Sequence, residues 1–175
     1  MYKIIERQDL SDIVHLFKIS APEVARKAQP GQFVIVRIDE KGERIPLTFA
    51  DWDTQAGSVT IVFQEIGATT CRLARLNAGE SIANFVGPLG IPTHIDEYGT
   101  VVCVAGGIGV APISPIARAL KQSGNKVISI MGARTKNLLF WENKLRQFSD
   151  ELIITTDDGS YGRPGLVTVP LQEIL

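Results

Sequence analysis

Apolar and polar positions follow two different patterns along the chain, and the two patterns meet near residues 95–99. Before this point, apolar residues fall in short alternating runs, as where Val59, Ile61 and Phe63 share one side of a strand. The six runs that predict strands are Tyr2–Gln8, Ile13–Ile19, Gln32–Ile38, Arg44–Ala50, Ser58–Glu65 and Ser81–Val86. Because closure of a sheet removes exposed strand edges, these runs predict a six-stranded antiparallel β-barrel.

After Tyr98-Gly99 the pattern changes to alternating strands and helices. Val101–Ala105 is a continuous apolar run, which is typical of a strand buried on both faces of a parallel sheet. A helix is expected next, with Pro112 and Pro115 in its first turn, where missing amide hydrogens cost least. The remaining expected elements are strands at Val127–Met131 and Leu152–Thr156, a helix through Leu138, Trp141, Leu145 and Phe148, and a helix at Thr168–Leu175.

These elements predict two domains, the barrel at 1–97 and an α/β parallel-sheet nucleotide-binding domain at 98–175. The second domain is expected to be incomplete, because no fourth strand follows the helix at Thr168–Leu175. In the usual strand order of such sheets, Val101–Ala105 is then left as an exposed apolar edge.

The composition indicates a folded chain without a strong charge field. Of the 175 residues, 45% are hydrophobic and 21% are charged, which excludes a disordered tail, a collagen-like repeat and a coiled coil. The net charge of −1 provides no basic field, so neither nucleic acid nor a membrane is expected as a partner. No apolar run approaches the roughly 20 residues that cross a bilayer, and Met1–Leu10 has no apolar secretory segment. We therefore expect a cytoplasmic protein.

Few residues outside the glycine-rich segments suggest chemistry. Cys71 and Cys103 are too few for an iron–sulfur cluster or a zinc site, so both are expected to be small packing residues. His15 and His94 have no serine or cysteine partner at a suggestive spacing, and both are expected at a surface or interface. These residues predict no catalytic acid or base and no metal site.

The sharpest local signal is the glycine-rich segment Ala105–Pro112, which follows a predicted strand and opens a predicted helix. Glycines at such a turn let the backbone approach a pyrophosphate, and the helix start offers free amides and the positive end of its dipole. The segment departs from the common dinucleotide fingerprint, because Pro112 replaces the third glycine and Arg134, not an acidic residue, follows the second strand. A purely structural glycine turn remains the alternative at this point.

Two segments of the predicted barrel suggest a second anion site. Gly67–Thr70 precedes a short apolar periodicity, so that one of its threonines can cap a helix whose amides face an anion. In Arg44–Thr48, the arginine can pair with a phosphate, Pro46 frees a backbone edge, and the Thr48 hydroxyl can bond a ring atom. Each segment by itself also fits an ordinary capped connector or a solvated strand.

Several motifs occur together in one order along the chain. They are Pro30-Gly31-Gln32-Phe33, Arg44-x-Pro46-Leu47-Thr48, Gly67-x-Thr69-Thr70, Gly87-Pro88-Leu89-Gly90 and Gly106-Gly107-x-Gly109-x-Ala111-Pro112. This combination resembles the ferredoxin-NADP reductase superfamily over essentially the whole chain. The segment Thr155–Gly162 is most similar to two electron-transfer subunits: that of dihydroorotate dehydrogenase, and the ferredoxin-NADP reductase alpha subunit of electron-bifurcating transhydrogenases.

The resemblance implies positions for two cofactors. The residues matched to the FAD site, along its isoalloxazine and its phosphates, are Arg44, Pro46, Leu47, Thr48, Gly67, Thr69 and Thr70. The residues matched to NAD(P)H, from the nicotinamide half to the adenosine end, are Gly106, Gly107, Gly109, Pro112 and Arg134. Asp157 and Asp158 match a loop near the nicotinamide nucleotide and receive no chemical role.

The function implied by the resemblance is that of a flavoprotein electron-transfer subunit, in which hydride passes between NAD(P)H and FAD. Electrons would then leave singly toward a [2Fe-2S] centre and a larger catalytic or electron-accepting subunit, with ferredoxin among the candidates. The cysteine cluster of full-length relatives is not in this sequence, so we expect the chain to be part of a longer subunit. The alternatives are a non-catalytic flavin-binding fragment or docking module, and a stand-alone flavin reductase; NAD and NADP are not distinguished.

Overall fold

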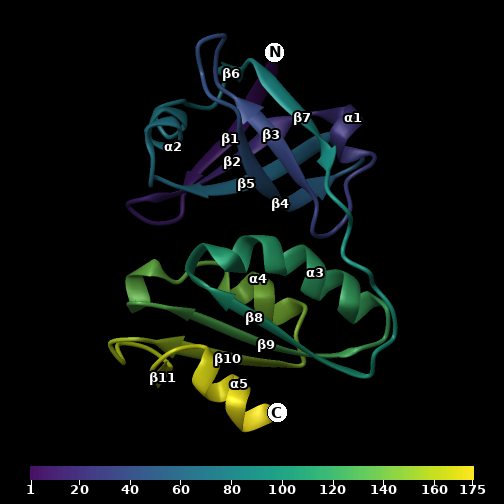
Figure 1. Cartoon of the computed structure of the whole chain (residues 1–175), viewed down its shortest axis with the longest axis vertical. Helices are drawn as coiled ribbons and strands as arrows, with labels where there is room; N and C mark the ends of the chain where they lie inside the picture. The colour runs from purple at the N-terminus through teal and green to yellow at the C-terminus, as the bar shows by residue number, and fades with distance from the viewer. The chain divides into compact units, whose positions relative to one another are not determined.

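The computed structural model describes all residues from Met1 to Leu175. The chain forms two compact units, Met1–Thr93 and His94–Leu175, whose elements are labelled in Figure 1. The sequence placed a domain boundary after residue 97, four residues further along the chain. These are named the barrel unit and the α/β unit.

The barrel unit is one antiparallel sheet of seven strands in the order β6-β1-β2-β5-β4-β3-β7. Its strands are β1 (Tyr2–Asp9), β2 (Val14–Ser20), β3 (Phe33–Arg37), β4 (Ile45–Asp53), β5 (Ser58–Gln64), β6 (Ser81–Ile82) and β7 (Asn84–Leu89), and its helices are α1 (Pro22–Ala25) and α2 (Ala68–Leu73). The antiparallel barrel-like architecture expected from the alternating runs is confirmed.

The strand count differs from the six expected, because the run Ser81–Val86 divides at Ala83. Ala83 lies between two strands that pair at opposite ends of the sheet. Its amide donates to the Ile38 carbonyl, 2.9 Å away. β6 pairs with β1, whereas β7 pairs with β3. The chain thus passes from one edge strand directly to the other, and this connection nearly closes the barrel.

The core of the barrel unit is aromatic and β-branched. Phe17, Phe49, Phe63 and Phe85 are essentially inaccessible to solvent, and the rings of Phe17 and Phe63 meet edge-on with centroids 5.0 Å apart. Burial of one such side chain stabilises the fold by roughly 1.5–3 kcal/mol. The barrel is therefore a packed interior, and ligand-binding groups must lie on its strand ends, loops or outer face.

The α/β unit is a parallel sheet in the order β11-β10-β9-β8. Its elements are β8 (Thr100–Gly106), η1 (Gly107–Gly109), α3 (Val110–Gln122), β9 (Lys126–Ala133), η2 (Lys136–Leu138), α4 (Glu142–Gln147), β10 (Glu151–Thr156), β11 (Arg163–Pro164) and α5 (Thr168–Ile174). The order of the three main strands is as predicted and leaves β8 at an edge. The short strand β11 was not expected.

Helices cover both faces of this sheet (Figure 1). α3 and α4 contact each other and pack on one face of the sheet, α3 against β8 and β9 and α4 against β10. On the other face, Val167 and Leu171 of the α5 region pack against Ile128, Ile130 and Ile153. The α/β domain expected from the sequence is confirmed. None of the helices has both the length and the apolarity needed to cross a membrane.

Two details of the predicted helices are wrong. α3 begins at Val110, so Pro115 lies inside the helix instead of in its first turn. The residues Leu138 to Phe148 do not form one helix, because Trp141 adopts a left-handed conformation with φ of 61°. A right-handed helix cannot continue through such a residue, and α4 therefore begins only at Glu142.

Candidate functional site

The strand β4 carries the first group of predicted FAD-binding residues. Pro46, Leu47 and Thr48 lie within β4, which pairs with β3, and Arg44 immediately precedes it. Arg44 and Pro46 are exposed, while Leu47 and Thr48 are partly buried. The Arg44 guanidinium makes no hydrogen bond or ion pair within the chain, so its charge is available to an anionic ligand.

The second group lies in the turn Ile66–Thr70 at the start of α2, which we call the barrel turn. The Thr70 Oγ1 accepts hydrogen bonds from the amides of Ile66 and Gly67 at 3.1 and 3.0 Å. A Cβ on Gly67 would meet no atom within 4 Å. Since the first amides of any helix lack partners within it, this turn presents free amides on an open backbone.

A hydrogen bond joins these two groups. The Thr69 hydroxyl donates to the Glu43 carboxylate, 3.1 Å away, and Glu43 is the neighbour of Arg44. Arg72 of α2 also pairs with Asp39 in the same β3–β4 loop at 2.5 Å. The structure therefore brings the beginning of β4 beside the barrel turn, as one phosphate-bearing ligand would require.

The predicted nucleotide-binding residues of the α/β unit lie on three neighbouring loops. β8, β9 and β10 are parallel and in register, so that Gly106 and Thr155 both lie opposite Gly132. The loops that leave the carboxyl ends of these strands carry Gly106, Gly107, Gly109, Arg134, Asp157 and Asp158, and Pro112 lies in the first turn of α3. This edge of a parallel sheet is where such folds bind ligands.

Open space surrounds the glycine turn Gly106–Gly109, and the fold does not require glycine at every one of its positions. Gly107 has a positive φ of 52°, which favours glycine. Gly106 and Gly109, in contrast, have ordinary φ angles of −101° and −58°. A Cβ at any of these three glycines would meet nothing within 4 Å. Neither backbone conformation nor packing requires glycine at 106 and 109, which favours close approach by a ligand over a purely structural turn.

Hydrogen bonds join the loops after β9 and β10. The amides of Asp157 and Asp158 donate to the carbonyls of Ala133 and Arg134 at 3.0 and 3.2 Å. Asp158 Oδ1 accepts from the side chain and the amide of Ser160, and these bonds lower the pKa of Asp158. The exposed side chains of Arg134 and Asp157 make no such contacts, so one cationic and one anionic group remain available at this edge.

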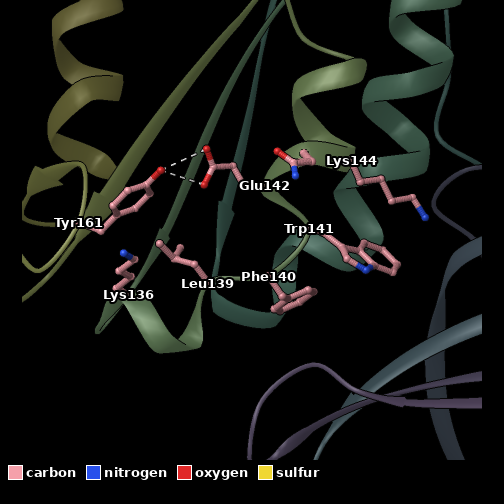
Figure 2. A pocket seen from close by; sticks show the side chains of 8 residues that line it. Lys136, Leu139, Phe140, Trp141, Glu142, Lys144 and Tyr161 are labelled. Carbon is pink, nitrogen blue, oxygen red and sulfur yellow. Dashed lines mark hydrogen bonds between the residues drawn. The ribbon is translucent and has the colours of Figure 1, made fainter.

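A cavity of about 560 Å³ opens beside these loops (Figure 2). Figure 2 shows the Tyr161 hydroxyl donating to both carboxylate oxygens of Glu142, at 3.2 and 3.3 Å, and Glu142 raises the pKa of Tyr161. The Lys144 ammonium lies 3.8 Å from the centre of the Trp141 ring. The lining residues are Lys136, Leu139, Phe140, Trp141, Glu142, Asn143, Lys144 and Tyr161. The sequence did not reveal this cavity, because Trp141 was interpreted as part of a helical stripe.

His15 is the clearest functional group that the sequence misplaced. It was expected at a surface or interface, but only 4% of it is exposed. Its Nδ1 lies 2.7 Å from Asp9 Oδ1 and its Nε2 lies 2.7 Å from Glu65 Oε1, so its burial is compensated by two polar contacts. Period 2 places His15 on the same side of β2 as the core residues Phe17 and Ile19, and this signal could have located it.

The two cysteines differ from each other. Cys103 is buried in β8, where desolvation raises the pKa of its thiol, and it has the expected packing role. Cys71 of α2 is only partly buried and lies outside the hydrophobic core of the barrel unit. His94, unlike His15, is exposed and lies 2.7 Å from the Tyr98 hydroxyl.

Comparison with known proteins identifies the family. No family model matches the chain. The dihydroorotate dehydrogenase B (NAD(+)) electron transfer subunit of Geobacillus thermodenitrificans is 31% identical over 97% of this chain and 68% of its own length. The homolog of that subunit in Thermotoga maritima is 42% identical, over 98% of this chain and 61% of its own length. This chain belongs to the family of dihydroorotate dehydrogenase electron transfer subunits. The predicted resemblance to the ferredoxin-NADP reductase superfamily is thereby confirmed.

Two solved structures share the fold of this electron transfer subunit family member. One is an NADH-dependent reduced ferredoxin-NADP oxidoreductase, described for flavin-based electron bifurcation, with a TM-score of 0.94 and 41% sequence identity. The match covers 99% of this chain and 63% of the oxidoreductase chain. A cytochrome P450 reductase from Amycolatopsis shares the fold at 18% identity, with a TM-score of 0.82. This match covers 99% of the present chain and 57% of the reductase chain.

The chain spans only part of the length of several relatives. It spans 62% of an uncharacterized Clostridium beijerinckii protein, which is 45% identical over the whole of this chain, and 61% of the Thermotoga maritima homolog. The barrel and α/β units therefore account for about three fifths of these longer proteins.

Proposed function

We propose that the chain is the FAD- and NADH-binding part of a flavoprotein electron-transfer subunit. In this scheme FAD binds the barrel unit, NADH binds the carboxyl edge of the α/β sheet, and hydride passes between them. The observation that carries the proposal is the glycine turn. Open space surrounds the backbone at Gly106 and Gly109, although neither their φ angles nor their packing requires glycine at these positions.

The residues of the barrel unit fit a flavin dinucleotide. The unpartnered Arg44 guanidinium and the free amides of the barrel turn suit two negatively charged phosphates. Pro46 and Leu47 offer apolar surface along β4, and the Thr48 hydroxyl offers a hydrogen bond to a ring atom. FAD, when bound, supplies the conversion between two-electron and one-electron transfer.

In the α/β unit, the protein's task is placement. The glycine turn lets the backbone approach the nicotinamide half of the nucleotide, and the amides at the start of α3 face its phosphates. Pro112 has no amide hydrogen of its own, so it leaves the neighbouring first-turn amides as the donors. Hydride transfer between two bound cofactors needs orientation and exclusion of water, and no acid or base of the chain is assigned to it.

We infer a preference for NADH over NADPH from the loop after β10. Asp157 and Asp158 place two carboxylates at this edge, where they repel a 2′-phosphate, and a free carboxylate such as that of Asp157 accepts hydrogen bonds from ribose hydroxyls. Arg134 opposes this preference in part. The names of the relatives support it, since one is an NAD(+)-linked subunit and another is NADH-dependent.

We propose that the electron acceptor lies outside this chain. In this proposal electrons pass to a [2Fe-2S] centre in a segment beyond Leu175 and then to a larger catalytic or electron-accepting subunit, with ferredoxin as one candidate. The support comes from relatives that are subunits of dihydroorotate dehydrogenase and from the ferredoxin-NADP oxidoreductase that shares the fold. Dihydroorotate dehydrogenase and an electron-bifurcating complex are the two candidate assemblies.

The decisive experiment is flavin loading followed by reduction. The purified chain is incubated with FAD, freed of excess flavin and mixed anaerobically with NADH. We expect a yellow protein whose visible flavin absorbance bleaches on NADH addition, faster than with NADPH. A chain that stays colourless at any FAD concentration would overturn the proposal. A chain that binds FAD but does not bleach would be a non-catalytic flavin-binding module.

A further inference from the structure

His15 is a buried residue of the barrel unit whose ring contacts two carboxylates that reach solvent. Its two ring nitrogens each lie 2.7 Å from a carboxylate oxygen, one of Asp9 and the other of Glu65. Arg7 also pairs with Asp9, at 3.2 Å. The side chain of His15 is 5% exposed, whereas those of Asp9 and Glu65 are 56% and 31% exposed. The ring thus lies inside the protein, and each carboxylate also reaches solvent.

The geometry sets the charge of the ring. An ionised carboxylate only accepts hydrogen bonds, so both nitrogens of His15 must carry a hydrogen for both contacts to form. The ring is then an imidazolium between two negative charges. Loss of one proton would leave a nitrogen lone pair facing a carboxylate oxygen, and that contact would become repulsive. The groups that face the ring are Asp9 and, behind it, Arg7 from β1, and Glu65 after β5; the Phe63 ring packs 5.6 Å away.

Glu65 connects this network to the barrel turn. It follows β5 directly, and its amide donates to the Ile13 carbonyl at 2.9 Å. The next two amides, those of Ile66 and Gly67, donate to Thr70 Oγ1. His15 therefore holds the residue from which the barrel turn departs, although it contributes no atom to the turn itself.

We propose that His15 is a positioning residue that holds Glu65, fixes the barrel turn and thereby supports flavin affinity. Its effect on flavin rests on the function proposed above, whereas its effect on the turn does not. With the imidazole in place, Asp9 and Glu65 are both held and the turn is ordered. Without it, the contact with Glu65 is lost and the turn loosens.

Amide hydrogen exchange of the barrel turn tests the inference without any ligand. Peptides covering residues 64–71 are compared between wild type and His15→Gln under the same conditions. We expect about tenfold faster exchange in His15→Gln, corresponding to the loss of one charge-assisted hydrogen bond.

Two further variants separate positioning from general support. In Glu65→Gln the side-chain amide can still accept from the His15 ring or donate to it, so protection of the turn should persist. His94→Gln removes the other histidine of the chain and should behave as wild type. If His15→Gln instead speeds exchange equally in peptides of the barrel core around Phe17, His15 is merely structural and the inference is wrong. Equal exchange of the turn in wild type and His15→Gln would also overturn it.

Flavin affinity provides the second measurement. FAD binding, followed by flavin fluorescence, should be about tenfold weaker in His15→Gln than in wild type. It should stay close to wild type in Glu65→Gln. A wild-type chain that binds no FAD would refute the proposed function, while the exchange experiment would still decide the role of His15. Equal FAD affinity in wild type and His15→Gln would refute the effect of His15 on flavin binding.

Discussion

The barrel turn, Ile66–Thr70, and the glycine turn, Gly106–Gly109, are both open backbone segments at the start of a helix, but they are held differently. Side chains fix the barrel turn: Thr70 caps it, Thr69 contacts Glu43, and Glu65 contacts His15. The glycine turn has no side-chain cap and follows from backbone conformation at the end of β8. We therefore expect the barrel turn to respond to single side-chain deletions, and the glycine turn to respond to added atoms.

The largest effect is expected from Gly109→Ala. The φ of −58° and the empty space around Gly109 accommodate a methyl group, so the melting temperature should stay the same or rise slightly. The added methyl occupies the space that NADH needs, and a displacement of about 1 Å reduces the rate of hydride transfer about 100-fold. Anaerobic stopped-flow bleaching by NADH measures this rate.

Gly67→Ala is the matched control for that variant, because it adds the same methyl to the other turn, where a Cβ also meets nothing within 4 Å. It should weaken FAD binding and leave the dependence of bleaching on NADH concentration unchanged in the flavin-loaded fraction. An unchanged NADH reaction in Gly109→Ala would show that the glycine turn is structural after all.

Thr70→Val should give the next largest effect. The variant removes the oxygen that accepts from the amides of Ile66 and Gly67, and it should destabilise the barrel unit by about 1 kcal/mol. FAD affinity should fall about tenfold, because the turn loses its cap. Thr70→Ser keeps the hydroxyl and should restore both quantities, measured by urea unfolding and flavin titration. Equal losses in the serine and valine variants would point to the methyl group instead.

The same contrast explains what the sequence could and could not predict. The glycine turn and the strand ends β8, β9 and β10 were predictable, because they depend on local conformation and on apolar periodicity. The network around His15 was not, because Glu65 is 50 residues away and meets the ring only through the pairing of β2 with β5. Alternation alone could place His15 on the core side of β2, but it could not name the partners that make its burial tolerable.

Two other features depend on tertiary context in the same way. The division of Ser81–Val86 into β6 and β7 follows from a hydrogen bond between Ala83 and Ile38, which no local pattern signals. The left-handed Trp141 interrupts an apolar stripe that has helical spacing, and its ring contacts Lys144 instead of continuing that stripe. Trp141 lines the cavity beside Tyr161, whereas periodicity assigned it to a helical stripe.

A smaller effect is expected from Asp157→Asn at the edge of the α/β sheet. Removal of this exposed carboxylate lowers the repulsion of a 2′-phosphate and takes away an acceptor for ribose hydroxyls. For an exposed charge the ratio of NADPH to NADH bleaching rates should rise about threefold. Arg134→Gln is the opposite control and should lower the ratio by a similar factor. A ratio that is the same in both variants as in wild type would place the adenosine end of the nucleotide elsewhere.

The smallest expected effect concerns acid stability of the barrel unit. The hydrogen bond from His15, followed by the one from Arg7, lowers the pKa of Asp9 below its ordinary value of 3.8. Because the folded pKa is the lower one, the network stabilises the fold above the unfolded pKa, and this stability is lost as pH falls through the folded pKa. Asp9 is 56% exposed, so the contribution after solvent screening is a few tenths of a kcal/mol, on the order of an exposed ion pair. Asp9→Asn should therefore flatten the unfolding free energy below about pH 4, measured by urea unfolding at each pH. An acid limb as steep in Asp9→Asn as in wild type would show that other carboxylates set the acid sensitivity of the unit.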